Sequence, residues 1–172
     1  MQRRTVIIVG LAAALSLLSA TGRGAESLTT IPMVQKETAT YYVQGAIGGY
    51  GDVELMVDTG AGYTTINEET LAVLLEAGEA VYVKKLTGVL ADGSRKTLPV
   101  YRLRRLVLGN QCVLRDVEAA VLPRRTRLIL GLSALEKAAP FVFSTRPPRL
   151  SLTNCGVWPA AGQRARLQST PS

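Results

Sequence analysis

The sequence contains no histidine. This absence excludes catalytic triads built on histidine and metal sites that depend on histidine ligands. Aromatic residues are scarce, at 5% of the 172 residues. The basic pairs Lys84-Lys85, Arg104-Arg105 and Arg124-Arg125 are scattered and not interleaved with aromatic residues, so no nucleic-acid partner is expected despite the formal charge of +7.

Only two cysteines are present, Cys112 and Cys155. A thiol nucleophile would lack the histidine that usually activates it, so a cysteine-based enzyme is not indicated. The sequence does not give the distance between the two residues, so a disulfide and two separate thiols both stay open.

No apolar run in the chain reaches the ~20 residues of a membrane-spanning helix. The first 25 residues instead have the pattern of a secretory signal peptide: Arg3 and Arg4, an apolar run from Val6 to Ala20, and small residues after it. We therefore expect export, and predict the periplasm as the location. The alternative is that residues 1–25 stay uncleaved as an anchor, which is the one way in which we expect this protein to contact a membrane.

The length of the chain favours one domain. We predict a linker over residues 26–39, which are mostly polar and contain Pro32, and a folded domain over residues 40–155. Residues 156–172 are rich in Pro, Gln, Ser and Arg, which indicates a disordered tail.

Valine, leucine, isoleucine, threonine and glycine are plentiful, and the domain alternates as strands do, so an all-β fold with one or two short helices is predicted. Turns are expected at residues 48–51, at Asp92-Gly93 and at Gly109-Asn110. One helix is expected to begin after Asn67 and to end at Gly78. A second is expected near Ser133, because Ser133 and Glu136 have the spacing of a capping box.

The segment "ELMVDTGAGYTTI" places an acidic residue, Asp58, at the end of an apolar strand and just before a turn of small residues. A strand holds such a carboxylate rigidly, and Gly60 allows a tight turn and close approach of a substrate. An exposed aspartate that merely opens an Asx-turn would give the same Asp-Thr-Gly sequence. A second element, Leu128-Ile129-Leu130-Gly131, lies about 70 residues further on and precedes the second expected helix.

Together these two elements resemble those of single-domain, retropepsin-like aspartic proteases of the exported bacterial type. The resemblance covers roughly residues 40–154, and residues 88–100 resemble the flap hairpin of that family. It implies a one-lobe acid-protease barrel. Gly62 stands where many relatives carry serine or threonine, whose hydroxyl can hydrogen-bond the catalytic carboxylate.

The resemblance implies an aspartic endopeptidase that activates a water between two carboxylates, which share one proton. Because the chain has a single Asp-Thr-Gly, the second carboxylate would be Asp58 of another copy in a homodimer. The implied catalytic residues are Asp58, Thr59 and Gly60. The implied contacts to a polypeptide substrate are Ala61, Gly62, Asp92, Gly93, Leu130 and Gly131. No metal or other cofactor is implied.

Two alternatives stay open. The first is a catalytically silent module of the same fold that binds or assembles other proteins in the periplasm. The second is a membrane-tethered regulator that keeps its apolar N-terminus. The other aspartates, Asp52 and Asp116, do not lie in a comparable turn of small residues, and we interpret them as surface or turn residues.

Overall fold

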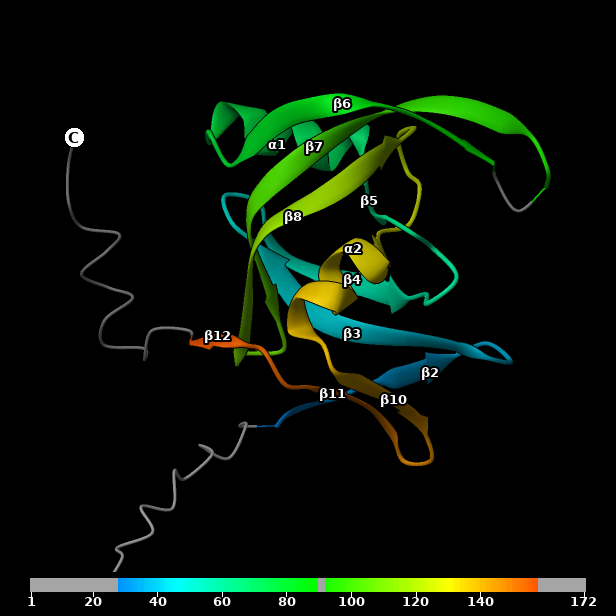
Figure 1. The fold of residues 1–172 in the computed structure, drawn as a ribbon, viewed down its shortest axis with the longest axis vertical. Helices are drawn as coiled ribbons and strands as arrows, with labels where there is room; N and C mark the ends of the chain where they lie inside the picture. Colours follow the sequence, from blue (N-terminus) through cyan, green and yellow to red (C-terminus); the bar gives the residue numbers. More distant parts are fainter. Residues whose placement is uncertain (1–27, 90–91, 158–172) are drawn as a thin grey trace, which may run out of the picture.

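The computed structural model describes residues 28–89 and 92–157. The predicted signal peptide, residues 1–25, and all but the first two residues of the predicted tail lie outside the described residues. Within the described ranges, no helix is long and apolar enough to cross a membrane. The described part is mostly β, as the sequence predicts (Figure 1).

Two sheets organise the strands. The larger has nine strands in the order β12-β8-β5-β9-β4-β3-β7-β6, with β2 added beside β3, and the smaller has the order β1-β11-β10. A further pairing of β7 with β8 joins strands far apart in this order, so the larger sheet curves back on itself as a barrel. The strands are β1 (Thr29–Pro32), β2 (Val34–Lys36), β3 (Thr40–Ile47), β4 (Gly51–Val57), β5 (Thr64–Asn67), β6 (Ala80–Val89), β7 (Arg95–Leu108), β8 (Cys112–Leu122), β9 (Ile129–Leu130), β10 (Phe141–Thr145), β11 (Pro148–Leu152) and β12 (Gly156–Val157).

The core lies inside this curved sheet. Its largest fully buried side chains come from strands of both sheets and from the two helices, and include Leu55, Leu103 and Leu150. Side chains of a β-strand alternate between faces, and residues 106–108 of β7 and 112–114 of β8 are all buried, so both faces are covered there, whereas charged residues are exposed in the middle of both strands. The barrel predicted from the sequence is therefore filled by apolar side chains.

The hairpins predicted from turn residues are confirmed. The chain turns between β3 and β4 with Gly49 and Gly51 at positive φ, and between β7 and β8 with Gly109 at positive φ. The longest hairpin joins β6 to β7, and its arms pair from Ala80↔Leu103 to Val89↔Arg95. We call this the flap hairpin; in Figure 1 it extends well beyond the body of the barrel.

Both helices are short. Helix α1 (Glu68–Glu76) begins after Asn67 as predicted, because the Asn67 side chain accepts a hydrogen bond from the backbone N–H of Thr70 at 2.9 Å. Gly78, at φ +67°, follows the end of the helix. Helix α2 (Leu132–Leu135), continued by the 3₁₀ turn η1 (Glu136–Ala138), lies against β8 and β5.

The linker predicted for residues 26–39 is wrong where the structure describes it. Strand β1 pairs with β11 over Thr29↔Leu152 to Pro32↔Arg149, and β2 pairs with β3. Ile31 and Met33 are buried, with 2% and 6% of their surfaces exposed. Two apolar side chains among polar neighbours are enough to place this segment in the core, so the folded domain begins before residue 40.

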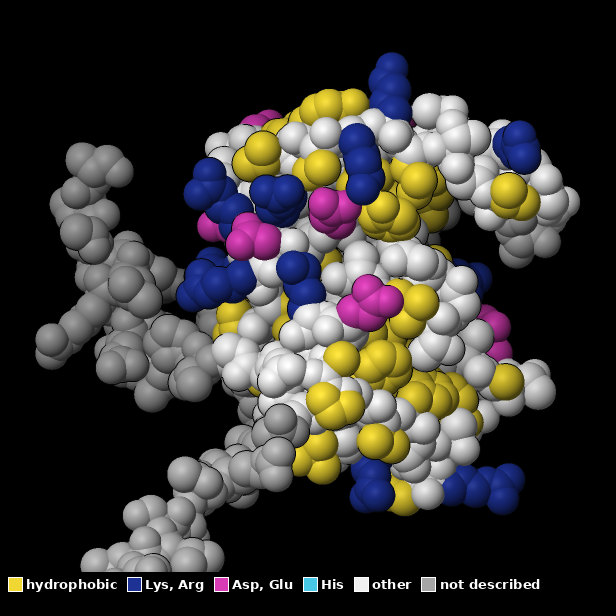
Figure 2. Space-filling model, in the orientation of Figure 1, with side chains coloured by type: hydrophobic (Ala, Val, Ile, Leu, Met, Phe, Trp, Pro, Cys, Tyr) yellow, Lys and Arg dark blue, Asp and Glu magenta, His cyan; other side chains and the backbone are white. Residues whose placement is uncertain are grey.

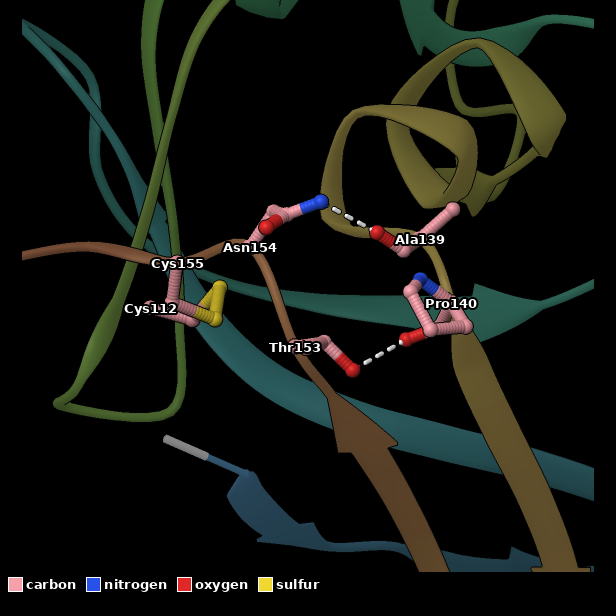
Figure 3. The surroundings of a disulfide bond; sticks show 6 residues. All are labelled: Cys112, Ala139, Pro140, Thr153, Asn154 and Cys155. Carbon is pink, nitrogen blue, oxygen red and sulfur yellow. Dashed lines mark hydrogen bonds between the residues drawn. A yellow bond between two sulfur atoms is a disulfide. The ribbon is translucent and has the colours of Figure 1, made fainter. Parts of the chain in front are cut away.

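The two cysteines form a disulfide, Cys112–Cys155, which the sequence left open. The bond joins the start of β8 to the segment before β12, and β12 itself pairs with β8 at Gly156↔Val113. Nearby, the Thr153 hydroxyl donates to the backbone oxygen of Pro140 at 2.7 Å, and the Asn154 amide donates to that of Ala139 (Figure 3). The C-terminal part of the described chain is thus attached to the barrel covalently and by hydrogen bonds.

Candidate active site

Asp58 lies directly after β4, at the start of the loop that leads to β5 (Figure 1). Its side chain is half-buried, whereas Thr59 and Gly60 are exposed. One carboxylate oxygen, Oδ1, accepts a hydrogen bond from the backbone N–H of Gly60 at 2.9 Å. The carboxylate is therefore held in one orientation with its second oxygen available, at a surface of small residues.

Strand β9 supports this carboxylate from behind. It pairs in parallel with the end of β4, Met56 with Ile129 and Val57 with Leu130, and the backbone N–H of Asp58 donates to the oxygen of Leu130 at 3.1 Å. The element that the sequence placed about 70 residues after Asp58 thus lies beside it. Leu130 is fully buried and Gly131 is also buried, so both support the loop, and the substrate contacts predicted for them are wrong.

Gly131 is required by close packing against the loop. A β-carbon built at this position would lie 2.3 Å from the backbone oxygen of Tyr63 and 2.8 Å from that of Ala61. The N–H groups that follow Gly131 also reach the loop: Leu132 donates to Ala61 at 2.8 Å, and Ser133 donates to Gly62 at 3.1 Å. The start of α2 therefore fixes the backbone of the Asp58 loop by hydrogen bonds.

Ser133 was not among the predicted site residues, and its predicted role as a helix cap is wrong. Gly131 is the residue before α2, and Ser133 lies within that helix. Its hydroxyl donates to the backbone oxygen of Glu118 at 2.7 Å and accepts from the backbone N–H of Thr64 at 2.8 Å. Ser133 thus connects α2, β8 and β5 just where the Asp58 loop ends.

Replacement of Ser133 by alanine is expected to lower the free energy of unfolding by about 2 kcal/mol, because two backbone groups in a partly buried position lose their partner. Urea denaturation of both proteins, followed by circular dichroism, measures this change. Ser144, a half-buried serine in β10 for which the structure gives no side-chain hydrogen bond, supplies a matched control variant, Ser144→Ala. Equal losses in the two variants would contradict the role given to Ser133.

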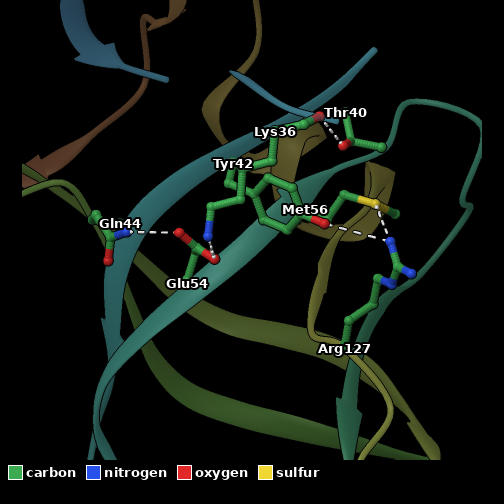
Figure 4. A network of polar contacts seen from close by, with 7 residues as sticks. All are labelled: Lys36, Thr40, Tyr42, Gln44, Glu54, Met56 and Arg127. Atoms are coloured by element: carbon green, nitrogen blue, oxygen red, sulfur yellow. Dashed lines mark hydrogen bonds and ion pairs between the residues drawn. The ribbon is translucent and has the colours of Figure 1, made fainter. Parts of the chain in front are cut away.

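A polar network on β2, β3 and β4 reaches the segment before β9 (Figure 4). Arg127 lies near the Tyr42 hydroxyl, at 3.4 Å from Nη1, and near the Met56 sulfur, at 3.7 Å. Lys36 pairs with Glu54 at 2.6 Å and lies 5.0 Å from the centre of the Tyr42 ring. The network thus links Arg127, which precedes β9, to Met56 of β4, which lies two residues before Asp58.

Asp92 and Gly93 lie at the tip of the flap hairpin, as predicted. Asp92 Oδ1 accepts hydrogen bonds from the side chain of Ser94 at 2.6 Å and from its backbone N–H at 2.9 Å, and these bonds lower the pKa of Asp92. Gly93 takes φ +80°, where glycine is favoured. These contacts account for the shape of the turn, and the substrate contacts proposed for the two residues stay a prediction.

A depression of about 600 Å³ adjoins the Asp58 loop. It is lined by Gly62 and Tyr63 from the loop and does not include Asp58 itself. Asp116 belongs to this lining, and Asp52 lies at the other end of β4 from Asp58. Among the described residues there is no group of three or more metal-ligating side chains.

Comparison with known proteins agrees with this geometry. A protein-family model described as "Aspartyl protease" matches residues 43–134, more than half of the chain. No curated protein matches the sequence. Among solved structures, the chain is similar to a retropepsin-like aspartic protease from Rickettsia conorii, with 21% identity, a TM-score of 0.52 and coverage of 73% of this chain and 91% of that chain. The retropepsin-like fold predicted from the sequence is confirmed.

Proposed function

This chain belongs to the aspartyl protease family, and we propose that it is an aspartic endopeptidase whose active form is a homodimer. The observation that carries the proposal is the placement of Asp58. The end of β4, the Gly60 N–H and the backbone of Leu130 together hold one carboxylate at the surface.

A single Asp58 supplies only half of the required chemistry. Peptide hydrolysis by two carboxylates needs one to take a proton from water and the other to give a proton to the carbonyl oxygen of the cleaved bond. Two carboxylates in contact do not both ionise readily, so the pair holds one proton between them. Since the sequence has one Asp-Thr-Gly, the partner in our proposal is Asp58 of a second copy.

The exposure of Thr59 and Gly60 supports this arrangement. A second copy related by a two-fold axis through the Asp58 loop would cover the same residues on both chains, as a symmetric dimer requires. The substrate in this proposal is an extended polypeptide lying between the two loops, with the flap hairpin of each copy beside it. Extended peptides add to exposed strand edges through main-chain hydrogen bonds, as a further strand would.

The proposal is tested by incubating the purified protein with a mixture of denatured proteins between pH 3 and pH 8, and reading the fragments by mass spectrometry. We expect cutting to be fastest at acid pH and to decline as the pH rises, because the proton shared by the two carboxylates is lost. The rate per chain is also expected to fall when the protein is diluted until the dimer separates. If a folded dimer cuts nothing at any pH, the protein is instead a binding or assembly module of this fold.

A further inference from the structure

Two cations, Lys84 and Arg102, share one carboxylate, Glu118, at the depression beside Tyr63; Arg102 and Glu118 line the depression, and Lys84 contacts Glu118 from β6. Lys84 Nζ lies 3.2 Å from Glu118 Oε2, and Arg102 Nη2 lies 4.0 Å from Glu118 Oε1. Lys84 Nζ also lies 5.4 Å from the centre of the Tyr63 ring. The hydrogen bond with Tyr63 and then the contact with Glu118 raise the pKa of Lys84, which keeps its charge at neutral and acid pH.

A register shift in the flap hairpin brings Lys84 to this position. Tyr82 pairs with Tyr101, and Lys84 pairs with Val100, so Val83 is the extra residue of a bulge. Side chains of directly paired residues lie on the same face of a hairpin, and Val100 is fully buried in the core. The bulge therefore places Lys84 on the inner face of the flap hairpin, toward the Asp58 loop, and Lys85 on the opposite face.

The charges of Lys84, Arg102 and Glu118 do not cancel. Glu118 is the only described carboxylate within salt-bridge distance of Lys84 or Arg102, so the three groups together carry one positive charge. The donors are also in excess, because an ammonium has three N–H groups and a guanidinium has five, whereas the contacts with Glu118 and Tyr63 use few of them. The exposed fraction of the side chain is 45% for Lys84, 49% for Arg102 and 29% for Glu118, so a ligand can reach all three.

The depression has further charged groups on β8 and η1. Ala119, which follows Glu118, pairs with Thr64 at the end of the loop, whereas Asp116 is two residues further back along β8. Glu136 and Lys137 lie in η1, after α2. Figure 2 shows Lys and Arg side chains interspersed with Asp and Glu over β6, β7, β8 and α2 on this face. Lys84 is the charged group that the structure places against the Asp58 loop, through the ring of Tyr63.

We infer that Lys84 and Arg102 form a carboxylate-binding subsite that selects the polypeptide substrate. This inference rests on the proposed protease function. A peptide lying between the Asp58 loop and the flap hairpin passes Tyr63, and a carboxylate of that peptide accepts hydrogen bonds from the free donors of both cations. The carboxylate is either an acidic side chain near the cleaved bond or the C-terminal carboxylate of the substrate.

The experiment uses a peptide that the purified protein cuts. Glutamate, glutamine or alanine is placed at each position on either side of the cleaved bond, and each peptide is made with a free C-terminal carboxylate and with a C-terminal amide. At one position we expect kcat/KM to be about tenfold higher for glutamate than for glutamine, as for a charge-assisted hydrogen bond at a partly exposed site. If the tenfold advantage follows the free C-terminus instead, the chain end is the ligand.

Two variants assign the effect to the subsite. Lys84→Met keeps the length of the side chain, and is expected to lower kcat/KM for the glutamate peptide more than for the glutamine peptide, so that the tenfold advantage of glutamate is lost. Lys85→Met, the neighbouring exposed lysine on the other face of β6, is the matched control and is expected to keep the advantage. A merely structural role of Lys84 would lower the rates for both peptides equally.

The outcomes separate this inference from the proposed function. Cutting without preference for a carboxylate at any position or at the C-terminus overturns the subsite and leaves the protease proposal standing. A preference that survives Lys84→Met and Arg102→Gln also overturns it. If no peptide or denatured protein is cut by the folded dimer, both proposals fail together.

Discussion

The Asp58→Asn variant is expected to cut polypeptides on the order of 10²–10⁴ times more slowly than the unmodified protein. Asparagine has the same size and keeps an oxygen to accept the Gly60 N–H, so the loop is expected to keep its shape. It can neither take the proton from water nor share one with a second carboxylate. The measurement is the initial rate on one peptide at the optimal pH, with the fold of each protein checked by circular dichroism.

Asp52→Asn is the matched control. Asp52 lies in β4, the strand that Asp58 follows, six residues before Asp58 and roughly 20 Å away along an extended chain. It is exposed, and its replacement is expected to leave the rate unchanged. Equal rates for the Asp58→Asn variant and the unmodified protein would remove Asp58 from the chemistry.

Mixing the unmodified protein with the Asp58→Asn variant tests whether the active site is shared between subunits. After subunit exchange in an equal mixture, about a quarter of the dimers carry two unmodified chains, so activity is expected to fall with the square of the unmodified fraction. A strictly proportional decrease would mean that each chain works alone. That result would contradict the shared site without affecting the role of Asp58.

The parts of the site that are local in sequence could be predicted. The Asp58 turn, the hairpin at Asp92-Gly93 and the Asn67 cap each depend on residues a few positions apart, whose turn and capping preferences are strong. The second element, Leu130-Gly131, could be placed near Asp58 only through the family resemblance. Its supporting role became clear from the backbone contacts of Gly131 with Ala61 and Tyr63.

The parts that depend on register between strands could not be predicted. A bulge at Val83 changes the face of β6 on which Lys84 lies, and Lys84 therefore reaches Tyr63 and Glu118. No residue pattern in β6 predicts that bulge. The hydroxyl of Ser133 satisfies two backbone groups that lie 15 and 69 residues away. The spacing of Ser133 and Glu136 predicted a helix cap, but tertiary contacts with β5 and β8 determine where the Ser133 hydroxyl bonds.

The disulfide is the feature whose removal is expected to change stability most. The bond closes a loop of 43 residues between Cys112 and Cys155. Restricting an unfolded chain by such a loop stabilises the folded state by about 4 kcal/mol. Replacing both cysteines by alanine is therefore expected to lower the free energy of unfolding by about that amount, measured by urea denaturation at a fixed protein concentration, since dissociation of a dimer depends on concentration.

Reduction supplies the control for this prediction. A reductant is expected to shift the unfolding midpoint of the unmodified protein toward that of the double alanine variant, and to leave the variant itself unchanged. If the reductant does not move the midpoint of the unmodified protein, the bond does not contribute as proposed. Such bonds persist in oxidising compartments.

Loss of the disulfide is expected to affect stability and not the chemistry. Cys112 lies at the start of β8, whereas β8 meets the end of the Asp58 loop at Ala119, roughly 23 Å further along the strand. The bond also encloses β9 and α2, which support the loop, but these elements contact it through backbone hydrogen bonds that do not involve either cysteine. At temperatures where the double variant stays folded, its cutting rate is therefore expected to equal that of the unmodified protein, and a lower rate would show that the bond also positions the site.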